Sequence, residues 1–348
     1  MPYPTTIRAV GIHKTGDVDV IEDLTLPFPA RKPGDILVKV QYAGVNFIDI
    51  YYRTGLYPVP SFPFAISGEV AGVIEELPSD EAVLNSEKYK QRGFKKGGKI
   101  TFMQQSSLAE YVTIPWDGPI FSVPDGISTR IAAAALAQGL SAIVHSTKSY
   151  DVKKGDTILI HTVAGGLGLL MCQVAKSRGA TVIGTTSTPA KAELAKAHGA
   201  DHVILYTQEN TVQRVAEITD GLGPHAIFDG VGKDTFDIDF KMIRCNGTLV
   251  SLGNSSGAVP PFSPLRLSEK NVRLLYPSLF NYLVTPEQRS YWGTKLWRLV
   301  AAGDLKINIF QDYPFTAEGV RRAQVDLTEG KTVGKLLIRV ADGVDSQT

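Results

Sequence analysis

The feature of this sequence that most limits its fold is a regular alternation of short apolar strands and helices between residues 131 and 252. Strands that alternate with helices form βαβ units, and successive units build a parallel, doubly wound α/β sheet. The predicted strands are Thr157 to His161, Thr181 to Gly184, Val203 to Leu205, Ala226 to Asp229 and Thr248 to Leu252. The predicted helices are Ala132 to Val144, Leu167 to Arg178, Ala190 to Ala197 and Val212 to Thr219, the last capped by Asn210 or Thr211.

A glycine-rich turn joins the first of these strands to the helix that follows it. It runs from Val163 to Gly168, with further glycines at 165 and 166. Glycine lets the backbone approach a pyrophosphate without an intervening Cβ, and the free N–H groups of the helix N-terminus face the anion. The turn therefore predicts a nicotinamide dinucleotide on a Rossmann-type domain. Val163 stands where the commonest pattern has its first glycine.

The end of the second strand indicates which dinucleotide binds. NAD enzymes place an acidic residue there to accept hydrogen bonds from the ribose. This chain has Thr185 to Thr188 instead, and Lys191 follows on the next helix. Hydroxyls and a cation suit a 2′-phosphate, so the pattern predicts NADPH. The alternative for Lys191 is an ordinary exposed helix lysine.

The segments on either side of the alternating region differ from it. Up to about Pro124, β-like runs such as Ile36 to Val40 and Val70 to Ile74 are separated by Gly and Pro, which indicates a mostly β domain. Within it, Ser79 to Gly97 is polar and predicts a surface loop with little packing content. The closing elements are too few to form a domain alone: helices Tyr291 to Ala302 and Thr316 to Leu327, and strand Lys335 to Val340.

We therefore predict that residues 1–128 and 283–348 form one domain, into which a Rossmann domain of residues 129–282 is inserted. The strand-like run Asn271 to Tyr276 would lie late in the inserted domain. An exposed edge there could pair with a second copy across a two-fold axis, so a homodimer is expected.

Composition excludes several classes of protein. Hydrophobic residues at 43% and charged residues at 20% are typical of a soluble globular chain. The net charge of +1 argues against nucleic acid as the main partner. No segment looks able to span a bilayer and no signal peptide is evident, so a cytoplasmic location is expected, with the nucleus also open. Cys172 and Cys245 are expected to be buried thiols.

Several motifs together carry a family resemblance. They are Ala43 to Asp49, Tyr51, Arg53, Gly55 to Pro58, the turn Ala164 to Gly168, and Gly253 to Gly257. In this combination the chain resembles the zeta-crystallin-like NADPH:quinone oxidoreductases of the medium-chain dehydrogenase/reductase superfamily. The resemblance implies that the mostly β domain is a GroES-like catalytic domain.

The resemblance also implies roles for individual residues. It places Asn46, Tyr51 and Arg53 in the catalytic site, with Asn46 and Tyr51 beside the nicotinamide. Family members often have an arginine near the phosphate pocket where this chain has Lys331, which is expected to substitute for it. The implied cofactor-binding residues are Asn46, Ser141, Ala164, Gly165, Gly166, Leu167, Gly168, Thr186, Ser187, Lys191, Tyr206, Gly230, Leu252, Gly253, Asn254 and Lys331.

The zinc-dependent relatives have different residues at two of these positions. They place cysteine where this chain has Asn46 and histidine where it has Ser67, and they carry a cysteine-rich structural lobe. With two cysteines and no clustered histidines, neither zinc site can be built, and a metal-free enzyme is expected.

A metal-free site suits the reduction of a quinone by NADPH, because the product ring becomes aromatic and delocalises the negative charge. The alternative reaction is reduction of an activated double bond in an enal or enone. A second class of role, RNA binding or a crystallin-like structural function, follows from the resemblance alone.

Plainer roles stay open for several candidate residues. Asn46 could be a buried amide that satisfies the backbone, and Tyr51 an ordinary core aromatic. Asp49 is expected at a helix entry rather than as a base. His145 and His161 show no triad or metal spacing and are expected to be structural.

Overall fold

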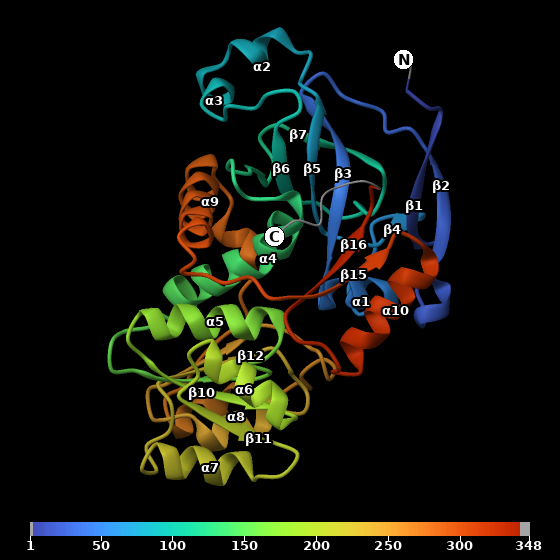
Figure 1. Cartoon of the computed structure of the whole chain (residues 1–348). Helices are drawn as coiled ribbons and strands as arrows, with labels where there is room; N and C mark the ends of the chain where they lie inside the picture. The colour runs from blue at the N-terminus through green and yellow to red at the C-terminus, as the bar shows by residue number, and fades with distance from the viewer. Residues whose placement is uncertain (1–2, 342–348) are drawn as a thin grey trace. The chain divides into compact units, whose positions relative to one another are not determined.

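The computed structural model describes residues 3–341 and divides the chain into two compact units (Figure 1). The first comprises the described residues up to Ala137, Thr285–Ala301, and those from Ile309 onward; the second comprises Gln138–Val284 and Ala302–Asn308. The predicted boundaries at 128/129 and 282/283 thus differ from those of the structure, and the short segment 302–308 belongs to the second unit. Among the described residues, no helix is long and apolar enough to cross a membrane.

The first unit is built on two β-sheets. In the larger sheet the strands follow the order β15-β16-β3-β5-β6-β8, with β7 also paired to β3, and the smaller has the order β2-β1-β4. The strands are β1 Thr6–Ile12, β2 Glu22–Pro27, β3 Asp35–Val45, β4 Phe64–Ala65, β5 Glu69–Glu76, β6 Lys99–Met103, β7 Tyr111–Pro115, β8 Ile120–Ser122, β15 Ile309–Pro314 and β16 Lys335–Arg339. The helices are η1 Val18–Val20, α1 Phe47–Thr54, α2 Glu81–Asn85, α3 Glu87–Lys90, α9 Pro286–Ala301 and α10 Ala317–Thr328, and α4 Thr129–Val144 begins in this unit.

The carboxyl end of the chain supplies the last two strands of the larger sheet. Strand β16 pairs antiparallel with β3, Leu336 lying opposite Val45. Its other neighbour, β15, runs parallel to it and is not predicted from the sequence. Only Tyr313 of β15 is buried, because β15 is an edge strand, so its sequence lacks the apolar alternation that marks a half-buried strand.

The segment Ser79 to Gly97 is more ordered than the sequence suggests. It contains the short helices α2 and α3, and Tyr89 on α3 is 6% exposed. The Tyr89 ring packs edge-on against Trp116, with ring centroids 5.6 Å apart, and also against Phe94. The prediction that this segment packs little against the rest of the unit is wrong. One aromatic residue, Tyr89, is enough to anchor the charged segment.

The second unit contains the predicted parallel sheet. Its strand order is β11-β10-β9-β12-β13-β14, and every neighbouring pair is parallel. The strand order reverses between β9 and β12, which makes that point the place where doubly wound sheets bind ligands. The strands are β9 Thr157–Ile160, β10 Thr181–Thr186, β11 His202–Leu205, β12 Ala226–Asp229, β13 Thr248–Ser251 and β14 Arg273–Leu275.

Helices cover this sheet and close its core. They are the end of α4, the π-helical turn η2 His145–Ser149, α5 Gly166–Ser177, α6 Pro189–Ala197, α7 Thr211–Ile218, α8 Phe236–Met242, η3 Pro264–Glu269 and η4 Leu279–Tyr282. Asn210 rather than Thr211 caps α7, since its side chain accepts a hydrogen bond from the backbone of Gln213. One core cluster joins strand residues such as Leu159 to Phe240 on α8.

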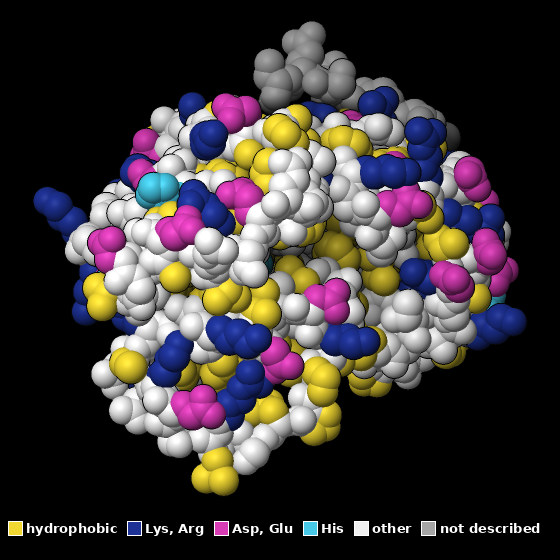
Figure 2. Space-filling view, turned by 90° about the horizontal axis from the view of Figure 1, so that it is seen from below, with side chains coloured by type: hydrophobic (Ala, Val, Ile, Leu, Met, Phe, Trp, Pro, Cys, Tyr) yellow, Lys and Arg dark blue, Asp and Glu magenta, His cyan; other side chains and the backbone are white. Residues whose placement is uncertain are grey.

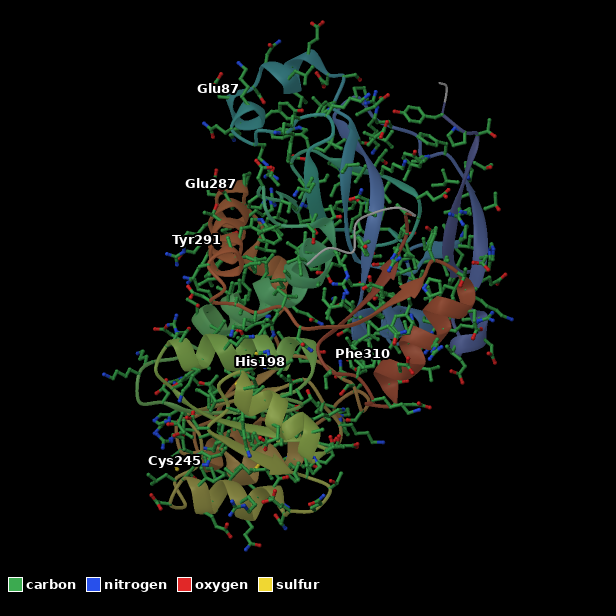
Figure 3. All side chains as sticks on the ribbon, in the orientation of Figure 1. Glu87, His198, Cys245, Glu287, Tyr291 and Phe310 are labelled. Atoms are coloured by element: carbon green, nitrogen blue, oxygen red, sulfur yellow. The ribbon has the colours of Figure 1, made fainter. Side chains whose placement is uncertain are left out.

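In this unit one helix was not predicted and one expectation is wrong. Helix α8 is not predicted, because Phe236 to Phe240 alternates apolar and acidic residues like a strand, whereas packing of Phe236 and Phe240 on the sheet holds it helical. Cys172 is buried as expected, but Cys245 is exposed in the turn between α8 and β13 (Figure 3).

Candidate functional site

The turn between β9 and α5 has the geometry of an anion site. Thr162 adopts a φ of 52°, a left-handed conformation that residues other than glycine rarely take and that recurs at functional sites. Its carbonyl accepts a hydrogen bond from the Gly165 N–H at 2.9 Å. A Cβ at Gly168 would lie 2.5 Å from that carbonyl oxygen, so this position requires glycine. The first N–H groups of α5 have no acceptor within the helix, and they suit a pyrophosphate.

Residues predicted to bind a 2′-phosphate lie around the end of β10. Thr186 ends this strand and its carbonyl accepts a hydrogen bond from the Tyr206 N–H at 3.1 Å. Ser187 follows, and the Thr188 hydroxyl caps α6 by accepting from the Lys191 N–H at 3.4 Å. The Tyr206 side chain is 51% exposed, and burial lowers the pKa of Lys191. This edge therefore presents hydroxyls and an ammonium group with no carboxylate between 185 and 191.

Four more predicted cofactor residues follow neighbouring strands at the same carboxyl edge, namely Gly230, Leu252, Gly253 and Asn254. The Leu252 N–H donates to the carbonyl of Asp229 at 2.6 Å. The Asn254 side chain donates to the Tyr276 hydroxyl at 2.6 Å. Ser141 is half-buried on α4. The second unit thus gathers the turn, the end of β10 and these loops at one edge of its sheet.

In the first unit, Asn46 lies between β3 and α1 and contacts charged side chains. Its Oδ1 accepts a hydrogen bond from Lys335 Nζ at 2.7 Å, and its Nδ2 donates to Glu69 Oε2 at 3.0 Å. Lys335 and Glu69 form an ion pair at 2.6 Å, and each side chain is 1% exposed. Glu69 also accepts from the backbone N–H of Ala137 at 2.6 Å. Asn46 itself is half-buried, and its amide does more than satisfy nearby backbone.

Asp49 occupies the predicted helix entry. Its carboxylate accepts a hydrogen bond from the Asn46 N–H at 2.8 Å, and it is the acidic residue of the first turn of α1. Burial raises the pKa of Asp49 to about 7, although the Asn46 hydrogen bond and the Lys335 charge oppose the shift. The expectation that Asp49 is a helix-entry residue is confirmed.

The Tyr51 ring is enclosed by aromatic neighbours on and after α1. Its centroid lies 5.2 Å from that of Tyr57 and 6.4 Å from that of Phe47, and the residue is 7% exposed. The Tyr51 carbonyl accepts a hydrogen bond from the Tyr57 N–H at 3.0 Å. These contacts hold the ring, while its catalytic role stays a prediction.

The Arg53 guanidinium has structural partners. Its Nε donates to Gln324 on α10 at 2.7 Å, and its Nη1 donates to the carbonyl of Gly16 at 2.8 Å. The same Nη1 lies 3.5 Å from a carboxylate oxygen of Asp17. These contacts anchor α1 to α10 and to an N-terminal loop, and the catalytic role stays a prediction.

Lys331 belongs to the first unit, near its last strand. Its ammonium pairs with Glu329 at 2.5 Å, and the side chain is 67% exposed. The role predicted for it as a phosphate ligand stays untested by these contacts.

Sequence analysis missed a buried network around His161 in the second unit. His161 Nε2 lies 2.8 Å from Asp239 Oδ1, and its Nδ1 lies 3.0 Å from the Thr185 hydroxyl. Asp229 is close by and accepts hydrogen bonds from the Thr235 hydroxyl. Burial lowers the pKa of His161, but the charge and hydrogen bond of Asp239 and the charge of Asp229 together outweigh burial, and the pKa is raised. Asp239 is 78 residues away in sequence, so no local spacing signals the pair.

The His161 network also contains ligand types that bind metals. His161, Asp229 and Asp239 are all buried, and their ligand atoms lie within 4.8 Å of one another. Existing hydrogen bonds occupy the histidine nitrogens and the Asp229 oxygens. His161 therefore connects the end of β9 to β10 through Thr185 and to α8 through Asp239, with the Asp229 carboxylate close by.

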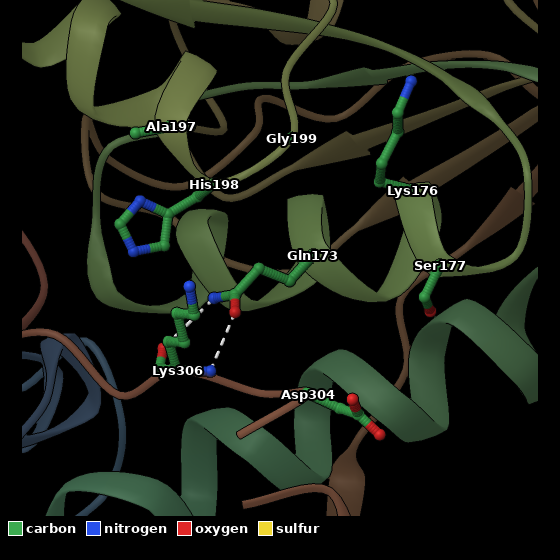
Figure 4. A pocket seen from close by; sticks show the side chains of 8 residues that line it. All are labelled: Gln173, Lys176, Ser177, Ala197, His198, Gly199, Asp304 and Lys306. Carbon is green, nitrogen blue, oxygen red and sulfur yellow. Dashed lines mark hydrogen bonds between the residues drawn. The ribbon is translucent and has the colours of Figure 1, made fainter. Parts of the chain in front are cut away.

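A surface pocket of about 300 Å³ lies elsewhere in the second unit (Figure 4). It is formed by the carboxyl-terminal half of α5, the end of α6 and segment 302–308, where Gln173 exchanges two hydrogen bonds with the Lys306 backbone. Lys176, His198 and Asp304 give it mixed charge. The carboxyl ends of two helices disfavour an anion there, and the glycine turn is at the opposite end of α5.

Two family models match the chain. The alcohol dehydrogenase GroES-like domain covers residues 32–125, and the zinc-binding dehydrogenase model covers residues 166–298. A Rossmann unit inserted in the sequence of a GroES-like unit is the architecture of the medium-chain dehydrogenases/reductases.

Individual relatives narrow the family. A quinone oxidoreductase of Pseudomonas aeruginosa is 36% identical over 88% of this chain and 91% of that protein. The crystal structure of Escherichia coli quinone oxidoreductase complexed with NADPH matches with a TM-score of 0.87 at 33% identity, covering 95% of this chain and 99% of that one. A 2-haloacrylate reductase of a Burkholderia species is 29% identical over 88% of this chain and 92% of that protein. The chain belongs to the quinone oxidoreductase family, which confirms the family expected from its motifs.

The side chains around Asn46 do not fit a zinc ion. Zinc in proteins is held by thiolates, imidazoles and carboxylates. Asn46 offers an amide, and the Ser67 hydroxyl lies within hydrogen-bonding distance of the Gly44 and Glu69 carbonyls. The Glu69 carboxylate, which accepts from the Asn46 amide, already pairs with the Lys335 ammonium, and this ammonium would repel a second cation.

Proposed function

We propose that this protein reduces quinones with NADPH. The observation that carries the proposal is the nucleotide turn before α5, in which Thr162 is held left-handed and Gly168 leaves no room for a Cβ. This turn belongs to a chain that is 36% identical to a quinone oxidoreductase. A turn of this kind presents N–H groups to a pyrophosphate.

The expected cofactor is NADPH rather than NADH. The turn Ala164 to Gly168 would hold the pyrophosphate, and Lys191 and Tyr206 would meet the 2′-phosphate beside Thr186 and Ser187. The acid-free end of β10 supports this choice, since a carboxylate there would repel the phosphate. The E. coli relative was solved with NADPH.

The first unit supplies a hydrogen-bond donor for the reduction. When bound, NADPH would supply a hydride. Asn46 uses one Nδ2 hydrogen on Glu69 and its Oδ1 on Lys335, which leaves the second Nδ2 hydrogen as the donor of this amide. We assign that N–H to a quinone oxygen, where it would stabilise the negative charge that develops. Tyr51 on α1 would lie beside the nicotinamide, and Arg53 would hold α1 in place.

Steady-state turnover tests the proposal directly. The purified protein is expected to oxidise NADPH in the presence of a benzoquinone or naphthoquinone, in metal-free buffer. No turnover with any simple quinone would refute it.

The phosphate pocket predicts a strong cofactor preference. Lys191→Met is expected to raise the KM for NADPH by about 10-fold or more, because a charge-assisted hydrogen bond to phosphate is lost, and to leave the KM for NADH unchanged. Lys196→Met, on the same helix, is the matched control, because Lys196 pairs with Glu193 on the surface. Tighter binding of NADH than NADPH by the wild type would contradict the assignment.

A second candidate reaction is reduction of an activated carbon–carbon double bond. The similarity to a 2-haloacrylate reductase favours testing it, since an α,β-unsaturated carbonyl also needs a donor at its oxygen. Comparing kcat/KM for a quinone with that for an alkenal separates the two reactions. A higher value for the alkenal would make double-bond reduction the main activity.

We also propose a soluble cytoplasmic homodimer joined through the sheet edge at β14. Support comes from the edge position of β14 and from the exposed apolar residues Leu265 and Tyr276 around it, 79% and 52% exposed. A monomeric mass in light scattering would refute the dimer. Acidic and basic side chains are interspersed on the face shown in Figure 2, so RNA binding is at most a secondary role, for which steep salt dependence is the test.

A further inference from the structure

Three neighbouring strands of the first unit bring Asn46, Glu69 and Lys335 together. Strand β3 ends at Val45, directly before Asn46, and it pairs antiparallel with β16 and with β5. Lys335 is the first residue of β16 and Glu69 the first of β5. The register therefore places a cation and a carboxylate on either side of the end of β3.

The backbone leaves space for this ion pair at one glycine. A Cβ at Gly44 would lie 2.5 Å from Glu69 Oε2 and 2.9 Å from Lys335 Cε. The pair is fully desolvated, and an apolar pair of similar size is often at least as stable as a buried ion pair. Stability alone therefore does not account for two charges at this place.

The hydrogen-bonding capacities of Lys335 and Glu69 select the orientation of the Asn46 amide. The ammonium can only donate, and the carboxylate can only accept. The observed amide orientation satisfies both, whereas a flipped amide would point its NH₂ group at Lys335 and its oxygen at Glu69. One amide orientation is selected, and the ammonium draws electron density toward Oδ1, which strengthens the remaining N–H as a donor.

We infer that Lys335 and Glu69 are positioning residues that orient and polarise the Asn46 amide toward the substrate. The inference rests on the proposed function, in which Asn46 donates to the quinone oxygen. Neither side chain touches the substrate, because each is 1% exposed.

Four variants test the inference by kinetics: Lys335→Met, Glu69→Gln, the double variant Glu69→Gln/Lys335→Met, and Lys39→Met as control. Lys39 lies on β3 and is exposed, so its variant should match the wild type. The double variant removes both charges, so it should fold even if Lys335→Met alone does not. We expect its kcat to fall about 10–100-fold, toward that of Asn46→Ala, with the KM for NADPH within about 2-fold of the wild type. A folded double variant with wild-type kcat would overturn the inference.

A readout that is independent of turnover separates the two proposals. The side-chain amide signals of Asn46, assigned by their loss in Asn46→Ala, should be two resolved resonances in the NMR spectrum of the wild type. In the double variant they should shift and broaden as the amide becomes free to flip. Unchanged signals would overturn the positioning role. A wild type with these signals but without quinone turnover would instead overturn the proposed function.

Discussion

Each unit of the protein buries a network of ionisable side chains. The two networks differ in whether they contact a partly exposed polar side chain. Lys335 and Glu69 in the first unit balance one charge of each sign and contact the half-buried Asn46. The His161 network in the second unit joins one imidazole to Asp229 and Asp239, and all its members are buried. A network that ends at an accessible polar group can act on a ligand, whereas an enclosed one can act only on the fold.

The His161 network nevertheless lies at the carboxyl ends of the strands, next to the glycine turn between β9 and α5. His161 directly follows β9 and precedes the glycine turn, and Thr185, its partner, is on β10. Asp229 ends β12 on the other side of the switch point. We expect the network to hold the strand ends at which the turn begins.

The largest effect is expected for the His161 network, where a substitution should lower the stability of the fold. His161→Leu should lower the free energy of unfolding by about 3–5 kcal/mol, because it leaves the Asp239 carboxyl buried without its partner. Urea denaturation measures the change. His202→Leu, at an exposed position on β11, is the control and should stay within about 0.5 kcal/mol of the wild type. A His161→Leu protein as stable as the control would show that the network does not support the fold.

A pH dependence of stability is expected from Asp49 in the first unit. Burial raises its pKa to about 7, so the native state keeps a proton that the unfolded chain releases near pH 4. The contribution of Asp49 is fully present below the unfolded pKa and falls by up to about 1.4 kcal/mol per pH unit as pH rises toward 7.

Urea denaturation between pH 5 and pH 8 of the wild type and Asp49→Asn measures this contribution. The difference between the two curves isolates Asp49 from other titrating groups. If stability depended on pH in the same way in both proteins, Asp49 would already be ionised in the folded state. The Lys335–Glu69 network would then have a further negative charge beside it.

The smallest effect is expected at Arg53. Its substitution tests whether this side chain anchors α1 or takes part in catalysis. Arg53→Met should lower stability by about 1–2 kcal/mol, because Gln324 and the Gly16 carbonyl lose their donor. The kcat for quinone should change by less than about 2-fold. A large loss of kcat with unchanged stability would favour the catalytic role implied by the family resemblance.

Local sequence patterns predicted much of the second unit. The strands of a doubly wound sheet, the glycine turn and the capping of α7 depend on residues a few positions apart, which the sequence displays directly. Elements whose stability comes from packing were missed, such as α8, held by Phe236 and Phe240, and the anchoring of α3 by Tyr89. Tertiary contacts override local propensity at such places.

By itself, the sequence determined the fold class, the position of the glycine turn and the absence of an acid at the end of β10, and it made Asn46 a candidate site residue. Only the tertiary structure decided what surrounds Asn46. Lys335 is 266 residues from Glu69 and 289 from Asn46, and the three meet because β16, β3 and β5 pair in one register. Sheet register brings residues together whatever their separation along the chain. No local sequence pattern could therefore predict that Lys335 and Glu69 contact the Asn46 amide.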